Sequence, residues 1–187
     1  MAAPLYGNIR EKILNASAEL LFEKAFSDIS LSDIAKKSCI SKGTLYYYYN
    51  SKDDILFDVA NIYLDKLAQS LIEWTENREK DTSLPRLLNY TLERGIFDES
   101  GALRLYLIGA AVSGHEAVRK KLTEKYEYFK TTLSQKLKER GIGEDSEYTA
   151  WLILIVLDGI LVQTQLKSPD FDAREIIKRT VRLLSKP

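Results

Sequence analysis

The chain has 187 residues, 45% hydrophobic and 29% charged, and its 27 Lys and Arg balance its 27 Asp and Glu. This length supports one large or two small domains, and a net charge of zero means that any nucleic-acid surface must depend on local charge. The single cysteine excludes an internal disulfide, and the single histidine excludes multi-histidine zinc sites. The longest apolar run, residues 151–157, is far shorter than the roughly 18 residues of a membrane span. A cytoplasmic protein without membrane contact is therefore expected.

Apolar residues recur with helical spacing along nearly the whole chain, which predicts an all-α fold of about nine helices. The first helix is expected from about residue 9 to residue 25. Its predicted buried face consists of Leu14, Ala18, Leu21, Phe22 and Ala25.

Residues 31–56 (LSDIAKKSCISKGTLYYYYNSKDDIL) predict two short helices joined by a three-residue turn, with a third helix starting directly afterwards. Ser30 and Asp33 have the spacing of a capping box at the start of the first. Ile34 and Ala35 supply its buried face. The turn is expected at residues 38–40, with Cys39 buried.

The second short helix is expected over residues 42–49, capped by the hydroxyl of Ser41. Leu45 and Tyr49 are four residues apart and would face the core. The other faces carry hydroxyls, aromatic rings and amines, which suit a DNA groove: Thr44, Tyr46, Tyr47 and Tyr48, next to Lys42 and Lys52. An aromatic packing patch, or a short strand formed by the tyrosines, remains an alternative.

This stretch resembles the helix-turn-helix of TetR-family transcriptional repressors, and the resemblance extends back to about Ile9. The matching positions are Ser30, Asp33, Ile34, Ala35, Ser41, Lys42, Gly43, Thr44, Leu45, Tyr46, Tyr49, Ser51 and Lys52. The chain departs from the family at Ala25 and Cys39, where the family usually has glycine. A left-handed backbone there would cost on the order of 1–2 kcal/mol, so the turn at Cys39 either bends differently or relies on packing to absorb strain.

The resemblance implies a DNA-binding domain at residues 1–52 and a helical ligand-binding and dimerisation domain at residues 53–187. The DNA contacts expected from it are Ser30, Ser32, Ser41, Lys42, Gly43, Thr44, Tyr46, Tyr47, Tyr48 and Lys52. Lys36 and Lys37 could either contact phosphates or form a solvated charged face.

Six further helices are expected in the second domain, at about residues 51–74, 85–95, 102–112, 116–140, 144–167 and 172–185. Residues 151–157 are apolar all round a helix, which implies burial on more than one side. In TetR-like proteins the last two helices form the dimer interface, and the resemblance assigns to it Trp151, Ile155, Gly159, Val162, Ile177, Val181 and Leu184.

The resemblance also implies a small-molecule pocket among the helices before this interface. The candidate lining residues are Tyr63, Tyr90, Arg94, Tyr106, Trp151 and Asp158, each of which could instead be an ordinary core or surface residue. The walls would be mainly apolar, which favours a hydrophobic inducer of unknown identity.

The sequence therefore predicts a homodimeric, sequence-specific regulator, a repressor released from a palindromic double-stranded DNA operator by a small hydrophobic ligand. Because no paired nucleophile and base, metal-ligand spacing or cofactor fingerprint is found, no enzymatic activity, metal or cofactor is expected. The alternative is a helical protein-interaction module that uses the helix-turn-helix only for packing.

Overall fold

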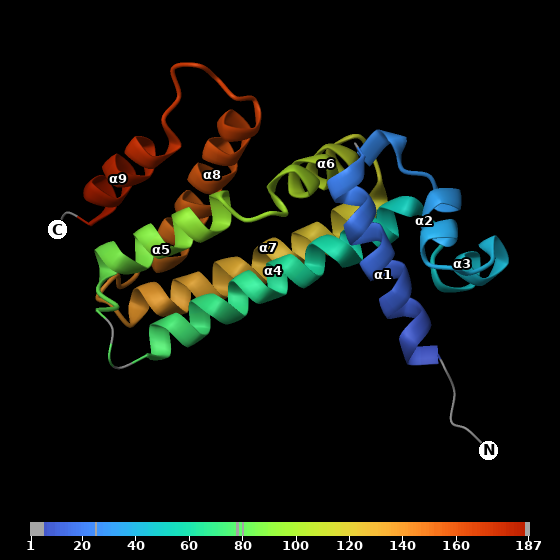
Figure 1. Ribbon diagram of the computed structural model, residues 1–187. Coiled ribbons are helices and arrows are strands. Elements are labelled where there is room, and N and C mark those ends of the chain that lie inside the picture. The colour runs from blue at the N-terminus through green and yellow to red at the C-terminus, as the bar shows by residue number, and fades with distance from the viewer. Residues whose placement is uncertain (1–5, 25, 78, 80, 186–187) are drawn as a thin grey trace. The chain divides into compact units, whose positions relative to one another are not determined.

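The structure is a computed structural model that describes residues 6–24, 26–77, 79 and 81–185 (Figure 1). Every regular element in this part of the chain is a helix, which confirms the predicted all-α fold. The elements are α1 (Tyr6–Glu23), η1 (Phe26–Asp28, a short 3-10 helix), α2 (Leu31–Lys37), α3 (Lys42–Tyr48), α4 (Lys52–Glu76), α5 (Leu84–Ile96), α6 (Gly101–Val112), α7 (Glu116–Lys138), α8 (Ser146–Gln165) and α9 (Ala173–Leu184).

The chain divides into two compact units. Unit 1 comprises Met1–Ile62 and Tyr106–Lys120, and unit 2 comprises Tyr63–Leu105 and Lys121–Pro187. Helices α4, α6 and α7 each contribute residues to both units. The expected boundary after residue 52 concerns where DNA binding ends, which compactness does not measure, and it stays a prediction.

The core of unit 1 joins α1, α2, α3 and the start of α4. Its buried members are Ile13, Leu20, Ile29, Ile34, Ala35, Leu45, Tyr49 and Ile55. The predicted face of α1 is displaced, because Ile13, Ala16, Ser17 and Leu20 are the fully buried positions while Leu14, Ala18 and Leu21 are half-buried. The Ser17 hydroxyl donates to the Ile13 carbonyl at 2.7 Å, so a polar residue is buried with its hydrogen bond satisfied. The Phe22 side chain and Ala25 lie outside the described part.

The core of unit 2 is built around α5, which packs against α8 and α9. Leu87, Leu88, Leu92 and Ile96 form the buried face of α5. Gly95 permits the closest approach, since a Cβ atom there would lie 2.4 Å from the Leu157 Cδ1 atom on α8. Such a contact requires a residue without a side chain.

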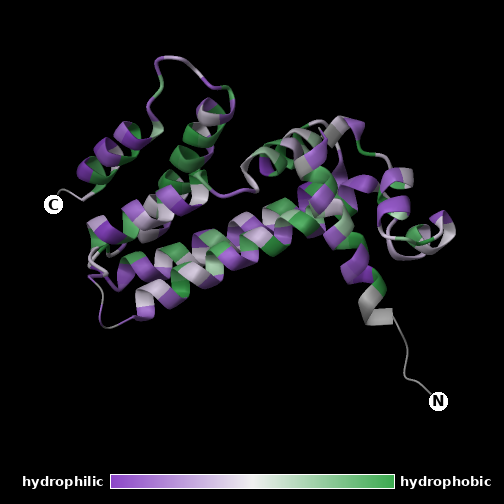
Figure 2. Cartoon of the chain, viewed as in Figure 1, coloured by the Kyte–Doolittle hydropathy of each residue, from purple (hydrophilic) through white to green (hydrophobic). Residues whose placement is uncertain are grey.

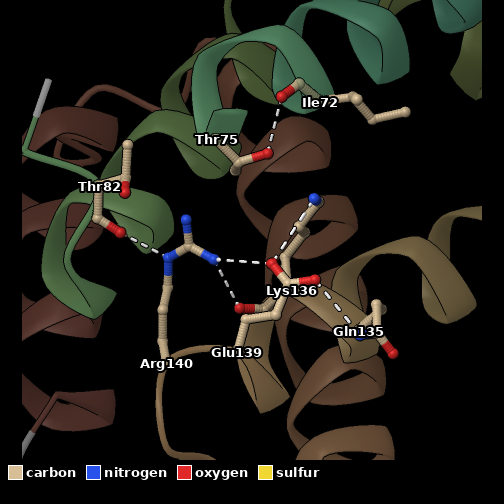
Figure 3. A network of polar contacts seen from close by, with 7 residues as sticks. All are labelled: Ile72, Thr75, Thr82, Gln135, Lys136, Glu139 and Arg140. Atoms are coloured by element: carbon tan, nitrogen blue, oxygen red, sulfur yellow. Dashed lines mark hydrogen bonds and ion pairs between the residues drawn. The ribbon is translucent and has the colours of Figure 1, made fainter. Parts of the chain in front are cut away.

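The loop between α4 and α5 is tied to the end of α7. Arg140 donates from Nε to the Thr82 carbonyl and from Nη1 to the Lys136 carbonyl, the latter at 2.8 Å (Figure 3). The rings of Trp74 on α4 and Tyr90 on α5 stack at 4.7 Å with an interplanar angle of 11°. These contacts hold the two sides of the loop together.

Helix α8 is strongly hydrophobic (Figure 2). It is the one helix in the described part that is long and apolar enough, by length and composition, to cross a membrane. This is weak evidence for a membrane span, because a core helix meets the same test. Here Ile153, Leu157 and Ile160 belong to the packed core of unit 2.

Candidate nucleic-acid interface

Side-chain caps fix both helices of the predicted helix-turn-helix. The Ser30 Oγ accepts from the Asp33 amide at 3.1 Å, and the Asp33 carboxylate accepts from the Ser30 amide at 2.9 Å, which confirms the predicted capping box. These bonds from Ser30 hold the pKa of Asp33 below its usual value. At α3 the Ser41 Oγ accepts from the Thr44 amide at 3.0 Å, as predicted.

The turn between α2 and α3 uses a left-handed residue. Cys39 has a φ of 57°. Its amide donates to the Lys36 carbonyl and the Ile40 amide donates to the Ala35 carbonyl, so α2 ends in a Schellman motif. The turn therefore keeps the backbone that the family gives to glycine. Cys39 is exposed, so the prediction that it is buried was wrong. Its side chain is not packed in a way that would absorb the strain.

The outer face of α3 carries the side chains expected to read DNA. Tyr47 is 80% exposed and Tyr46 is 54% exposed, so both rings are open to solvent. Lys42 and Gly43, at the start of the helix, are also exposed. The structure thus brings these four residues to one surface of unit 1.

Tyr48 differs from the predicted arrangement. It is half-buried and packs against the core cluster of unit 1, with its hydroxyl buried and without a hydrogen-bond partner. Its ring meets the Tyr47 ring edge-on at 5.3 Å. Leu45 and Tyr48 are three residues apart and therefore share the inner face of α3. The partly buried Tyr48 ring thus contacts the exposed Tyr47 ring from the core side of α3.

Tyr49 is buried as predicted, although it follows α3 with an extended backbone. Its hydroxyl donates to the Asp58 carboxylate on α4 at 2.9 Å and accepts from the Arg10 Nε on α1 at 3.1 Å. Arg10 also pairs with Asp58 at 2.6 Å. Burial raises the pKa of Tyr49 to about 12. This triad anchors the end of α3 between α1 and α4.

The lysines near this face differ in whether they form ion pairs. Lys37 pairs with Glu23 at 2.8 Å and Glu19 at 3.2 Å, so it belongs to a surface ion-pair network. Lys36 and Lys42 are exposed and make no ion pair among the described residues. The Lys52 ammonium lies 6.0 Å from the centre of the Tyr106 ring.

Three of the expected polar DNA contacts have defined positions. The hydroxyls of Ser30 and Ser41 are used as caps, and the Thr44 hydroxyl lies 2.8 Å from the Ser41 hydroxyl. Ser32 is exposed in the first turn of α2. A hydroxyl used as a cap can still accept or donate one further bond, so phosphate contact stays open to all four residues.

The structure places the six pocket candidates on several helices of the two units. Tyr106 belongs to unit 1, where its hydroxyl donates to Asp53 at 2.8 Å, and the same carboxylate lies 3.1 Å from the His115 Nε2. Tyr90 and Arg94 share an open groove of about 590 Å³ on unit 2, and a second groove of about 660 Å³ includes Arg94 with Arg174.

The remaining candidates lie elsewhere in unit 2. The ring of Tyr63 has the Lys66 ammonium 5.7 Å from its centre, and burial raises the pKa of Tyr63. Trp151 is exposed on α8. Asp158 on α8 accepts a hydrogen bond of 2.6 Å from the Tyr126 hydroxyl on α7.

Sequence reasoning missed two members of the Asp158 cluster, Tyr126 and Arg104. Burial lowers the pKa of Arg104 and raises that of Tyr126 beyond its usual range. The available signal was Arg104 itself, a charged residue inside the otherwise apolar helix GALRLYLIGAAV.

An apolar stripe runs along the exposed side of α8. Its members are spaced three or four residues apart, so they share one helix face: Tyr148, Trp151, Ile155, Gly159, Val162 and Leu166. Ile155 is 62% exposed and Leu166 is 66% exposed. On α9, Val181 and Leu184 are half-buried, whereas Ile177 is buried in the core of unit 2 and has little surface left for another chain.

Residues 13–59 match the family described as bacterial regulatory proteins, tetR family. The HTH-type transcriptional regulator QacR of Staphylococcus aureus is 28% identical over 100 residues, which is 49% of this chain and about half, 53%, of that protein. The negative transcriptional regulator of the icaADBC biofilm operon, IcaR of Staphylococcus epidermidis, is 27% identical over 80% of each chain. Among solved structures, a TetR transcription regulator from Haloarcula marismortui has a TM-score of 0.73 at 20% identity, covering 95% of this chain and 96% of that one.

Proposed function

Since the chain belongs to the TetR family of DNA-binding transcriptional regulators, we propose that it is a cytoplasmic repressor that binds a palindromic operator as a homodimer and is released by a small apolar molecule. The observation that carries the proposal is the exposed face of α3. A packing module would bury aromatic side chains, whereas this helix exposes two.

The surface proposed to contact DNA is the exposed face of α3, which combines aromatic rings with the start of a helix. Tyr46 and Tyr47 can contact thymine methyl groups and phosphates, and the exposed Lys42 and Gly43 allow the start of α3 to approach the bases. Tyr48 and Tyr49 hold the helix from inside. The DNA-binding function is assigned to residues 1–52, with Lys52 at the start of α4 as its last phosphate contact.

Electrostatic attraction to DNA is modest in this proposal. Lys36 and Lys42 are the lysines that can neutralise phosphates without giving up an ion pair in the described structure. Together with Lys52, these lysines give about three phosphate contacts in each protomer and about six per dimer. The slope of log affinity against log salt concentration is then about −5.

The exposed apolar stripe of α8 supports the homodimer. A row of exposed apolar residues along a whole helix is uncommon in a monomer, and a second copy of the same stripe would cover it. Glycine at position 159, where nothing lies within 4 Å of a Cβ atom in the single chain, allows two α8 helices to approach closely. The name of IcaR, a negative regulator, favours repression over activation.

The test is selection of bound sequences from a random DNA pool with the purified chain. A palindromic consensus with half-sites one helical turn apart, about 34–36 Å, is expected. Tyr47→Ala should weaken binding to that consensus by at least about tenfold and binding to random DNA less, while the melting temperature stays unchanged. Tyr128→Ala is the matched control, because Tyr128 is an exposed tyrosine of unit 2. Unchanged operator affinity in a folded Tyr47→Ala protein would support the packing module instead.

A further inference from the structure

Unit 2 holds a partly buried arginine whose hydrogen bonds are incomplete. Arg104, in the first turn of α6, donates from Nη2 to the carbonyl of Gly95 near the end of α5. Its Nε–H is buried and has no hydrogen-bond partner. A buried donor on a charged group that lacks a partner costs folding free energy, so such a group calls for an explanation.

The neighbouring acidic groups, Asp98 and Asp158, do not provide the missing acceptor. Asp158 acts on Arg104 through its charge, as does Asp98, but no direct ion pair joins either carboxylate to Arg104 in the described part of the chain. Asp158 instead accepts the hydroxyl of Tyr126 at 2.6 Å. Three partly buried polar groups thus belong to one cluster, and the arginine among them keeps a buried Nε–H without an acceptor.

Buried apolar residues flank this cluster on each of its helices. The buried residues that flank it along α6, α7 and α8 are Leu103, Leu122, Leu154, Leu157 and Leu161. On α8, Leu157 faces Gly95 and Leu161 faces Gly101, so α8 lies against the ends of α5 and α6 that meet at Arg104. A molecule that reached the free N–H of Arg104 would therefore have to carry an apolar body.

We propose that Arg104 anchors the carboxylate of an otherwise apolar effector that binds in unit 2. This deepens the proposed function and rests on it only in naming the bound molecule an effector of DNA release. A carboxylate accepts two parallel N–H bonds from the fork of a guanidinium, so it would satisfy Nε and neutralise the buried charge in one step.

Other ligand charges fit less well. A cationic ligand would lie beside a buried guanidinium, and like charges at short range repel strongly in an apolar environment. A neutral ligand could accept the free N–H but would add no negative charge beside the guanidinium, which has only the more distant carboxylates of Asp98 and Asp158 near it. Asp158 is held by Tyr126, so its carboxylate is not the free partner in the cluster.

A purely structural role for Arg104 makes a different prediction. If Arg104 only joined α5 to α6 through Gly95, an apolar replacement would lower stability and change nothing else. A ligand anchor is the opposite case, because replacing a buried, incompletely satisfied cation with an apolar side chain of similar length is often neutral or stabilising. The variant Arg104→Met separates the two roles.

The experiment uses the full chain without DNA, with 2-naphthoate and dodecanoate as probes and 2-naphthamide and dodecanol as neutral matches. Binding is measured by calorimetry and by the shift in melting temperature. The carboxylates should bind and the neutral matches should bind at least about tenfold more weakly. Arg104→Met should weaken carboxylate binding at least about 30-fold while the melting temperature stays at or above that of the parent chain. Arg174→Met, which removes an exposed arginine of unit 2, should bind like the parent.

Two further variants keep the test decisive. Asp158→Asn removes a negative charge near Arg104 and can still accept the Tyr126 hydroxyl, so it should strengthen carboxylate binding about tenfold. If Arg104→Met does not fold, Arg104→Lys keeps the charge but lacks the fork, and it should still lose most of the affinity. Equal binding of the neutral matches, undiminished binding to either Arg104 variant, or no binding of either carboxylate overturns the inference.

Release of the selected operator is measured separately. A chain that binds no DNA but binds carboxylates through Arg104 refutes the repressor proposal and leaves this site intact. A chain that binds its operator normally and binds neither carboxylate refutes this site alone.

Discussion

Replacing Cys39 with glycine should stabilise the protein. Cys39 has a φ of 57°, where an L-residue with a Cβ costs about 1–2 kcal/mol relative to glycine. Glycine has more freedom in the unfolded chain, which offsets about 0.5–1 kcal/mol of this gain. Because the side chain is exposed, little packing is lost. The net expectation for Cys39→Gly is about 0.5–1 kcal/mol, or about 1–4 °C in melting temperature for a chain of this size.

The assay is reversible urea unfolding of the parent, Cys39→Gly and Cys39→Ala, with the melting temperature as a second measure. Cys39→Ala is the matched control, since it removes the sulfur but keeps the Cβ atom that causes the strain. It should leave stability within about 0.5 kcal/mol of the parent. A Cys39→Gly protein no more stable than Cys39→Ala would refute the strain argument.

Three other changes test the packing, the buried tyrosine and the dimer. Gly95→Ala should destabilise the protein by about 1–3 kcal/mol in urea unfolding, because its Cβ atom would lie 2.4 Å from Leu157. Gly109→Ala, which has open space around it, should not destabilise the protein, and equal effects of the two substitutions would contradict the close approach. Burial raises the pKa of Tyr49 to about 12 in the folded chain from an ordinary value of 10.0, so its protonated hydroxyl stabilises the fold fully below pH 10 and this contribution is lost as the pH rises through 12. Tyr49→Phe should therefore reduce the fall in unfolding free energy across that window by up to about 1.4 kcal/mol per pH unit, and an unchanged slope in urea titrations would refute it. Ile155→Asp, at a 62% exposed position of the α8 stripe, should give monomers in sedimentation at micromolar concentration, and a dimer of unchanged strength would place the interface elsewhere.

The helix-turn-helix was readable from the sequence because its determinants are local. The capping box of Ser30 and Asp33, the cap at Ser41 and the buried positions Ile34 and Leu45 all depend on neighbours within four residues. Spacing over four residues can be read directly from the sequence. The same holds for the helix count and for the apolar character of α8.

Side-chain placement over longer distances was decided only by the tertiary structure. Tyr48 packs against the core of unit 1, and Tyr49 finds its partners on α1 and α4. Tyr106 joins Asp53, 53 residues away, and Asp158 joins Tyr126, 32 residues away. No period or motif encodes such pairs, because each is chosen by how separate helices pack.

The sequence by itself determined which helices form and that Ser30 and Ser41 cap α2 and α3, because backbone hydrogen bonding and helical spacing are local properties. Only the tertiary structure decided that Cys39 keeps a left-handed backbone and is exposed, that α8 leaves an apolar stripe uncovered and that the Arg104 Nε–H is buried without an acceptor. The burial of a side chain and the pairing of its hydrogen-bonding groups depend on residues far away in the sequence, which become neighbours only once the helices have packed.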